Sequence, residues 1–182
     1  MREDVILVDE NDNAIGTMEK MEAHQKGVLH RAFSVFILND KNELLIQRRA
    51  ESKYHSAGLW ANTCCSHQRK GESSIQAGQR RLYEEMGFRS SLQKLFSFIY
   101  KASFDNGLIE HEFDHVLLGY SNDKPKINTI EVDDFKWISI EKLNKDIVLK
   151  PEKYTAWFLI IFERFYKYVL DNNLSIANKK IN

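Results

Sequence analysis

Residues 71–88 read GESSIQAGQRRLYEEMGF, and this stretch has the clearest local signals for secondary structure in the chain. Ser73 and Gln76 have the spacing of a capping box, in which two side chains bond the free backbone N–H groups at a helix start. Gly87 stands where a helix C-cap is expected, and the apolar residues in between fall near one stripe. The stretch therefore predicts a helix over about residues 73–86.

Two hairpins are predicted before this helix. Alternating residues at 5–8 run into a turn-rich stretch at 9–13, which indicates a strand and a hairpin. Apolar strands at 32–38 and 43–49 flank a tight turn at 39–42. We therefore expect the first part of the chain to be mainly β-structure.

Regularity is lost at residues 52–68, which hold two His and two Cys residues and are predicted to form a loop dense in reactive side chains. Further strands are expected at residues 95–102, 110–120 and 135–139. An aromatic-rich helix is expected at about 152–171, followed by a polar, frayed tail at about 172–182. The order of elements predicts an α/β or α+β fold, with helices packed on a mixed sheet.

Length and composition limit the class of protein. The 182 residues suit a single domain, 1–182, because two domains would each approach the lower size limit for a self-sufficient core. Hydrophobic residues make up 43% and charged residues 29%, which allows a buried core and excludes a disordered chain. The 26 basic and 26 acidic residues cancel, so no global field would hold nucleic acid or an anionic membrane. Any anion site must be local.

The sequence also bears on cellular location. Cys64 and Cys65 are adjacent and cannot build a disulfide framework, so they indicate the reduced thiols of a cytosol. The first residues carry acids where a signal peptide needs bases, and no apolar run approaches the roughly 18 residues of a membrane span. We therefore expect a soluble, cytoplasmic protein that is not exported.

Paired carboxylates are the first candidates for chemistry. The two-residue period of a strand places Glu110, Glu112 and Asp114 on one face. Two carboxylates on one face favour a cation, whereas a solvated strand face is the commoner outcome for such residues taken alone. The rest of the chain has to decide between the two.

Three histidines could join these carboxylates. His24 and His30 flank a short turn before the first core strand, and His67 lies in the irregular loop, although no local spacing proves that they converge. Isolated histidines more often lie on the surface or in the core. With Glu110 and Glu112 they would form a mixed N/O shell that suits a divalent metal with an open position. Magnesium, manganese and zinc all remain open.

A thiol is the next candidate. Cys65 lies two residues before His67, in a loop that would share space with any metal held there. A reactive thiol and a buried, inert cysteine are both open, the second being the usual fate of this residue. Cys64 is expected to be the structural cysteine of the pair.

Counted back from Gly87, the opening stretch resembles the Nudix box, G-x5-E-x7-R-E-U-x-E-E-x-G-U, where U is a bulky apolar residue. The matching positions are Glu72, Arg80, Leu82, Glu84, Glu85, Gly87 and Phe88. Ser66 stands where the first Gly belongs, and Arg81 replaces a Glu. Nudix hydrolases use the clustered glutamates to hold magnesium against a diphosphate and to activate water. The charge reversal at Arg81 argues against ordinary Nudix hydrolysis.

The chain as a whole resembles the type I isopentenyl-diphosphate Δ-isomerases, which have a Nudix-like fold with a degenerate box. The resemblance covers about residues 20–162, and its most specific part is the Trp-x-Asn-x-x-Cys-x-His order of residues 60–67. It also includes His24, residues 29–34, 45–50, 71–72 and 80–87, Tyr100, residues 110–112 and Trp157. Some members have Gly at Ser66 and one more residue between His24 and His30, but neither departure removes a reactive group.

The resemblance implies a role for each matching residue. It implies a metal held by His24, His30, His67, Glu110 and Glu112. Cys65 and Glu112 would form the proton-transfer pair, and Glu85 would hold a magnesium ion that also bridges the substrate diphosphate. The residues implied to contact the diphosphate are Lys20, Arg49, Lys53 and Arg81. A cation at position 81 can bind a diphosphate without helping to cleave it, which accounts for the departure from the hydrolase pattern.

The implied reaction is a 1,3 proton transfer that converts isopentenyl diphosphate into dimethylallyl diphosphate through a tertiary carbocation. Water would quench that cation, so the site must be dry, and Trp157 is expected to present a π face to it. Tyr100 is expected near the thiol, where it assists protonation or orients Glu112. Cys65 as acid with Glu112 as base, and the reverse, both remain open.

Two other functions stay open at this point. A Nudix pyrophosphohydrolase is supported by Glu72, Arg80 and the two glutamates that follow, but opposed by Arg81 and Ser66. A non-catalytic Nudix-like binding domain would be expected to have lost the thiol and the metal ligands. We expect a small isoprenoid diphosphate as partner, no nucleic acid or membrane, and a monomer or weak homodimer.

Overall fold

The computed structural model describes residues 3–53, 55–104 and 106–172, so the tail predicted at 172–182 lies outside the described residues beyond Asn172. The strands are β1 (Asp4–Val8), β2 (Ala14–Glu19), β3 (His30–Leu38), β4 (Glu43–Arg49), β5 (Trp60–Ala61), β6 (Cys64–Ser66), β7 (Leu92–Ser103), β8 (Ile109–Tyr120) and β9 (Val132–Ser139). The helices are α1 (Lys20–Lys26), α2 (Ser74–Met86), α3 (Ile140–Leu149), the 3₁₀ turn η1 (Pro151–Lys153) and α4 (Ala156–Asp171).

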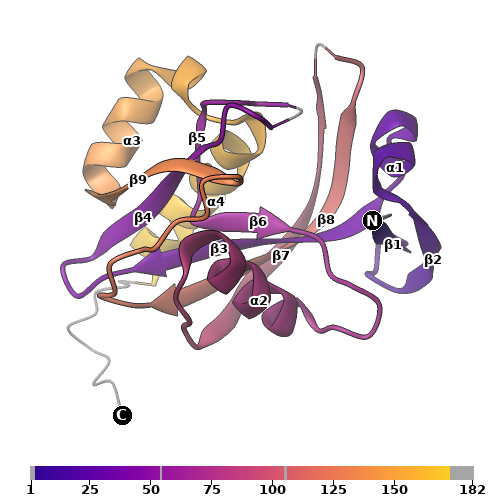
Figure 1. The fold of residues 1–182 in the computed structure, drawn as a ribbon, viewed down its shortest axis with the longest axis horizontal. Helices are drawn as coiled ribbons and strands as arrows, with labels where there is room; N and C mark the ends of the chain where they lie inside the picture. The colour runs from indigo at the N-terminus through magenta and orange to yellow at the C-terminus, as the bar shows by residue number, and fades with distance from the viewer. Residues whose placement is uncertain (1–2, 54, 105, 173–182) are drawn as a thin grey trace.

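One mixed sheet contains all of these strands (Figure 1). β3 lies at its centre and pairs in parallel with β8 over nine residues, from His30 opposite Glu112 to Leu38 opposite Tyr120. β7 continues the sheet antiparallel to β8, and the β1–β2 hairpin extends it on the other side of β3. The predicted mixed sheet with packed helices is confirmed.

The predicted hairpin of β3 and β4 is confirmed at its turn, but the two strands separate immediately. Their only paired residues are Leu38 and Leu44. Beyond them β3 pairs with β6 and β8, whereas β4 pairs with β5 and β9. The strand ends far from the turn therefore lie apart, and a cavity forms between them.

Alternation along the strands divides the core into two layers. On β3, Phe36 and Leu38 pack towards α4, whereas Val35 and Ile37 pack towards α2. Figure 1 shows α2 in front of the sheet and α4 behind it. The even-numbered residues of β8, to which Glu112 belongs, share the α4 side with Phe36.

Helix α2 forms as the opening stretch predicts. Ser73 is the N-cap, its side chain accepts a hydrogen bond from Gln76 N, and the Gln76 side chain accepts one from Ser73 N, which completes the capping box. Gly87 ends the helix with φ of 76°, in the left-handed region that glycine adopts at low cost. This firm helix carries Arg81 and Glu85 towards the sheet.

The structure differs from the predicted elements in one loop, in two helices that were not predicted and in the start of the last helix. The stretch 52–68 is not all loop, because it contains the short strands β5 and β6. The short turn expected before β3 is present, but helix α1, which precedes it and contains His24, was not predicted; its cap Glu19 is not a common N-cap type. Helix α3 was not predicted, and α4 starts at Ala156 rather than 152, because Thr155 caps it after the η1 turn.

The helices in the three described ranges are all too short or too polar to cross a membrane.

Candidate active site

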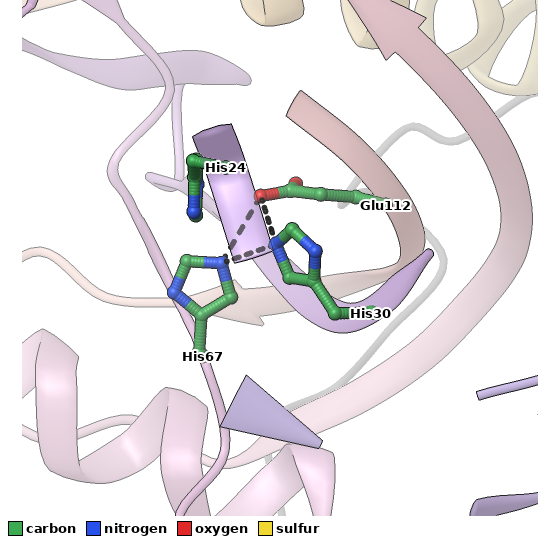
Figure 2. Close-up of side chains that lie close together, drawn as sticks. All are labelled: His24, His30, His67 and Glu112. Carbon is green, nitrogen blue, oxygen red and sulfur yellow. Dashed lines mark hydrogen bonds and ion pairs between the residues drawn. The ribbon is translucent and has the colours of Figure 1, made fainter. Parts of the chain in front are cut away.

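Four buried side chains, three of which line the cavity, lie close together. One ligand atom from each of His24, His30, His67 and Glu112 lies within 4.8 Å of the other three (Figure 2). His67 Nε2 lies 3.1 Å from Glu112 Oε1 and 3.2 Å from His30 Nε2. Imidazole nitrogens and a carboxylate oxygen form a donor set for a divalent metal. This group is therefore a candidate metal centre.

Each of these side chains is aimed by its backbone. His24, on α1, hydrogen-bonds through Nδ1 to the Lys20 carbonyl at 2.7 Å, and His30 does so to the Val28 carbonyl at 2.8 Å. Metal-binding histidines are commonly oriented by such bonds on the second ring nitrogen, which leave Nε2 free to bind. His30 and Glu112 face each other across the β3–β8 pairing. The fold itself thus assembles the four donors.

The protonation states also suit a metal. Burial lowers the pKa of His24, and it lowers the pKa of His67 to about 4. Burial alone would raise the pKa of Glu112, but its contacts with the His30 and His67 rings hold that pKa well below its usual range. Neutral imidazoles beside an ionised carboxylate are the forms that bind a divalent cation. The chain therefore supports divalent metal binding at this group.

Glu110 stands next to this group rather than within it. Glu110, Glu112 and Asp114 are all buried, so the solvated strand face is excluded. The Tyr100 hydroxyl lies 2.6 Å from Glu112 Oε2 and 3.2 Å from Glu110 Oε2. Burial and the neighbouring Glu112 raise the pKa of Glu110 well above its usual range. Tyr100 thus links the two glutamates. Glu110 lies beside the four-residue metal group and is not one of its members.

The two cysteines have different surroundings. Cys65, on β6, is partly exposed to the cavity and pairs across the sheet with Ser34 of β3. Burial raises the pKa of the Cys65 thiol well above its ordinary value, so the thiol is protonated at pH 7. Cys64 is fully buried in the layer between the sheet and α2. It has the structural position that was expected for it.

Trp157 forms a wall of the same cavity. It is the second residue of α4 and is 2% exposed. The guanidinium carbon of Arg49 lies 4.9 Å from the centre of its ring. Its buried indole nitrogen has no hydrogen-bond partner among the described residues. Trp157 thus gives the cavity an aromatic wall, against which Arg49 lies.

Three basic side chains of the lining, Lys20, Lys53 and Arg81, each contact an acid, whereas Arg49 bonds the His55 carbonyl at 3.2 Å. Arg81 Nη2 lies 2.6 Å from Glu85 Oε1, and Arg81 Nη1 lies 3.0 Å from Glu84 Oε2. Arg81 also lies 3.4 Å from Glu131, which binds Lys53 Nζ at 2.6 Å. These acids fix the cations of the lining before any anion enters.

The remaining two candidates lie on the same lining. Lys20 Nζ contacts Glu3 at 3.1 Å. Glu85 is 4% exposed, and its Oε2 accepts a 2.8 Å hydrogen bond from Gln47. Both therefore have a protein partner that a ligand would have to share or displace.

All the predicted site residues except His30 line this one cavity. The lining also contains residues that the sequence analysis did not select: Phe33, Ser34, Gln47, His55, Ser66 and Glu131. Gln47 could have been found from its place on a buried strand beside Arg49. His55 and Glu131 carried no signal, because their partners lie far away in the sequence.

Comparisons with known proteins agree with this fold. The NUDIX domain family matches residues 28–158. A solved structure from Deinococcus radiodurans, 21% identical, superposes with a TM-score of 0.74 over 89% of this chain and 98% of that one. The MutT protein from Methanosarcina mazei Go1, 23% identical, gives 0.63 over 79% and 95%. Fold and sequence together define a NUDIX-domain protein.

Two curated relatives narrow the class. The isopentenyl-diphosphate Delta-isomerase of Pectobacterium atrosepticum is 52% identical over 165 residues, which are 91% of this chain and 92% of the relative. Isopentenyl-diphosphate Delta-isomerase 2 of Aromatoleum aromaticum is 48% identical over 181 residues, 100% of this chain and 96% of the relative. The chain belongs to the isopentenyl-diphosphate Delta-isomerase family.

Proposed function

We propose that this protein converts isopentenyl diphosphate into dimethylallyl diphosphate by a 1,3 proton transfer. The observation that carries the proposal is the cavity that Cys65, Tyr100 and Glu112 line together, between an indole wall and a row of cations. A hydrolase would need a carboxylate where Arg81 stands. A binding domain would have no use for a thiol and a carboxylate facing one pocket.

The proton transfer uses a neutral acid and an ionised base. The Cys65 thiol gives its proton to the terminal CH2 of the alkene, which becomes a methyl group and leaves a tertiary cation at the adjacent carbon. The Glu112 carboxylate then takes a proton from the CH2 on the other side of that carbon, and the new double bond forms there. The protonated thiol and the ionised Glu112 favour this assignment over the reverse. Both groups must exchange protons before the next turnover.

The cation needs a dry, electron-rich wall. Trp157 supplies a π face, and cation–π contact contributes about 2 kcal/mol in a desolvated site. Tyr100 is 7% exposed and holds Glu112 by its hydroxyl, so it orients the base while it helps to exclude water. Both residues therefore act on the step that forms the cation and the step that removes it.

A divalent ion at His24, His30, His67 and Glu112, with Glu110 at the edge, would neutralise charge and fix the Glu112 carboxylate. Manganese, magnesium and zinc all match this N/O donor set. Magnesium would accompany the diphosphate, with Glu85 as its protein ligand, because hard oxygen donors suit that ion. Lys20, Arg49, Lys53 and Arg81 would bind the diphosphate oxygens by charge-assisted hydrogen bonds.

The experiment is NMR of isopentenyl diphosphate with purified protein and magnesium in deuterated water. The expected result is dimethylallyl diphosphate that carries deuterium, without phosphate release. Phosphate or diphosphate release would instead establish a hydrolase. Unchanged substrate in the presence of each of the three metals would leave only a binding role, and the proposal would be wrong.

Three further properties belong to the same proposal. Residues 1–182 would form one domain, since one sheet supports both core layers. The protein would work in the cytoplasm, where its two free thiols stay reduced. It would act as a monomer or weak homodimer. Light scattering across a concentration series would detect any stronger assembly.

A further inference from the structure

His55 lines the cavity but has no part in the proposed proton transfer. Its side chain is 6% exposed, and it lines two hollows rather than one. On one side lies the active-site cavity, with Trp157 and Glu110. On the other lies an outer groove with a mostly apolar lining, which includes Leu59, Tyr154, Ala156 and Leu159. The imidazole is therefore part of the boundary between the two.

Phe104 completes this boundary. The rings of His55 and Phe104 stack with centres 4.9 Å apart and planes 25° apart. The His55 ring meets Trp157 edge-on at 5.6 Å, and the Phe104 ring approaches Trp157 at 6.5 Å. The two side chains come from different segments, one after β4 and one between β7 and β8. We call this stacked pair, His55 and Phe104, the partition.

The partition lies on the Trp157 side of the cavity, next to Arg49, whose Nη2 donates a hydrogen bond to the His55 carbonyl at 3.2 Å. Arg81, a cation for the diphosphate, is on α2, whereas Trp157 is on α4, across the sheet. A substrate whose diphosphate is bound near Arg81 would extend its carbon chain towards Trp157. Added carbons would then meet the His55 ring, beyond which lies the apolar groove.

We propose that His55, with Phe104, determines the length of the isoprenoid chain that the cavity accepts. The inference rests on the proposed function, because it takes the ligand to be an allylic diphosphate. His55 is a specificity-determining residue in this role and not a catalytic one. Without the imidazole, the cavity and the groove would join, and added carbons would contact Leu59 and Leu159 instead of a wall.

The test compares two competitors of isomerisation, a five-carbon and a ten-carbon allylic diphosphate, with magnesium present. The proteins are wild type, His55→Ala, His55→Phe and Phe104→Ala. His55→Ala is expected to lower the inhibition constant of the ten-carbon compound at least tenfold relative to the five-carbon one. Tenfold corresponds to about 1.4 kcal/mol, which burial of about two methylene groups supplies. Phe104→Ala should shift the ratio in the same direction.

His55→Phe is the matched control. It keeps a flat ring in the partition but removes the polar contact of His55 Nε2 with Glu110 Oε1, at 3.9 Å. Its inhibition ratio is expected to equal that of the wild type. An equal shift in His55→Phe and His55→Ala would assign the effect to Glu110 and overturn the partition.

Two other results would overturn the proposal. One is a wild type that binds both compounds equally well, and the other is an unchanged ratio in both alanine variants. Turnover of isopentenyl diphosphate by the wild type is measured in the same assay. A failure of the proposed function appears there as absent turnover, whereas a failure of the partition appears as an unchanged ratio in an active enzyme.

Discussion

The Tyr100 hydroxyl lies 2.6 Å from Glu112 Oε2 and 3.2 Å from Glu110 Oε2, so one hydroxyl group lies between two buried carboxyl groups. Across the β7–β8 pairing, Tyr100 is directly opposite Glu112. The pairing register thus fixes this hydrogen bond. Burial and the two glutamates raise the pKa of Tyr100 well above its usual range, so the hydroxyl keeps its proton and remains a donor.

Tyr100→Phe is expected to lower kcat by about 10- to 100-fold, with a smaller effect on KM. The variant removes one hydrogen bond to a charged group, and such bonds contribute about 1.5–3 kcal/mol. Steady-state kinetics with isopentenyl diphosphate measures both constants. The matched control is Tyr154→Phe, which removes a hydroxyl that binds Asp146 at 2.6 Å away from this cavity. Equal kcat losses in the two variants would contradict the role of Tyr100.

Cys65→Ala is expected to abolish isomerisation while thermal unfolding stays close to that of the wild type. The thiol faces the cavity and supplies the proton in the proposed mechanism. General acid catalysis typically raises the reaction rate by about 10²–10⁴-fold, and Cys65→Ala removes this acid. Cys64→Ala is the control, because its thiol lies in the core on the α2 side. That variant should lose stability but keep kcat. Wild-type turnover in Cys65→Ala would contradict the role of Cys65 as the proton donor.

The sequence allowed most of the fold to be predicted, because its signals are local. The capping box at Ser73 and the alternation of β8 both depend on neighbours within a few residues, and both were confirmed. Helix α1 was missed because it has only seven residues, and their side chains include few apolar ones. It is nevertheless the element that carries His24 into the site.

The site was predictable only in part, for the same reason. The family resemblance supplied the identity of His30 and Glu112, but the parallel pairing that sets them opposite each other is a long-range property. His55 and Glu131 gave no signal, since their contacts with Phe104 and Arg81 span about fifty residues. Which of the ligands meet, and what encloses them, needed the three-dimensional arrangement.

Metal binding should depend on His67 but not on His111, a histidine that lies beside the site residues in the sequence. His67→Ala is expected to lower the bound divalent metal, measured by elemental analysis after gel filtration, by at least tenfold. His111→Ala is the control, because this residue lies between Glu110 and Glu112 but points to the Gly27 carbonyl, at 3.0 Å. Equal metal content in His67→Ala and wild type would contradict the four-ligand centre.

Stability of the metal-free protein should fall as pH drops from about 6.5 to about 4. Burial lowers the pKa of His115 to about 4, so within this window the unfolded chain binds a proton that the folded protein does not. Each such group gives a slope of up to about 1.4 kcal/mol per pH unit. Its imidazole contacts Asp12 at 3.0 Å, outside the active-site cavity.

The measurement is urea denaturation in a chelator at several pH values. His115→Gln should remove the contribution of His115 to the fall in the free energy of unfolding. The difference in unfolding free energy between wild type and variant should therefore narrow as pH falls. His67, whose pKa is also lowered to about 4, contributes in the same direction and remains in both proteins. A constant difference across the window would show that His115 binds its proton over the same pH range in the folded and unfolded states, which would contradict the lowered pKa.

Glu131 forms ion pairs with two of the cations that are proposed to bind the diphosphate. Its two oxygens lie 2.6 Å from Lys53 and 3.4 Å from Arg81, and the residue lines the cavity. A diphosphate that binds these cations must compete with a carboxylate of the same sign of charge. Glu131→Gln is therefore expected to lower the inhibition constant of inorganic diphosphate by about three- to tenfold, since one like charge near the anion is removed.

Glu84→Gln is the control for this effect. Glu84 also pairs with Arg81, at 3.0 Å, but it does not line the cavity. Its neutralisation should leave diphosphate inhibition within about twofold of wild type, because the charge is screened by solvent and by Arg80. Weaker inhibition in Glu131→Gln would instead make Glu131 a support that positions Lys53 and Arg81 for the anion, and the competition argued from these distances would be wrong.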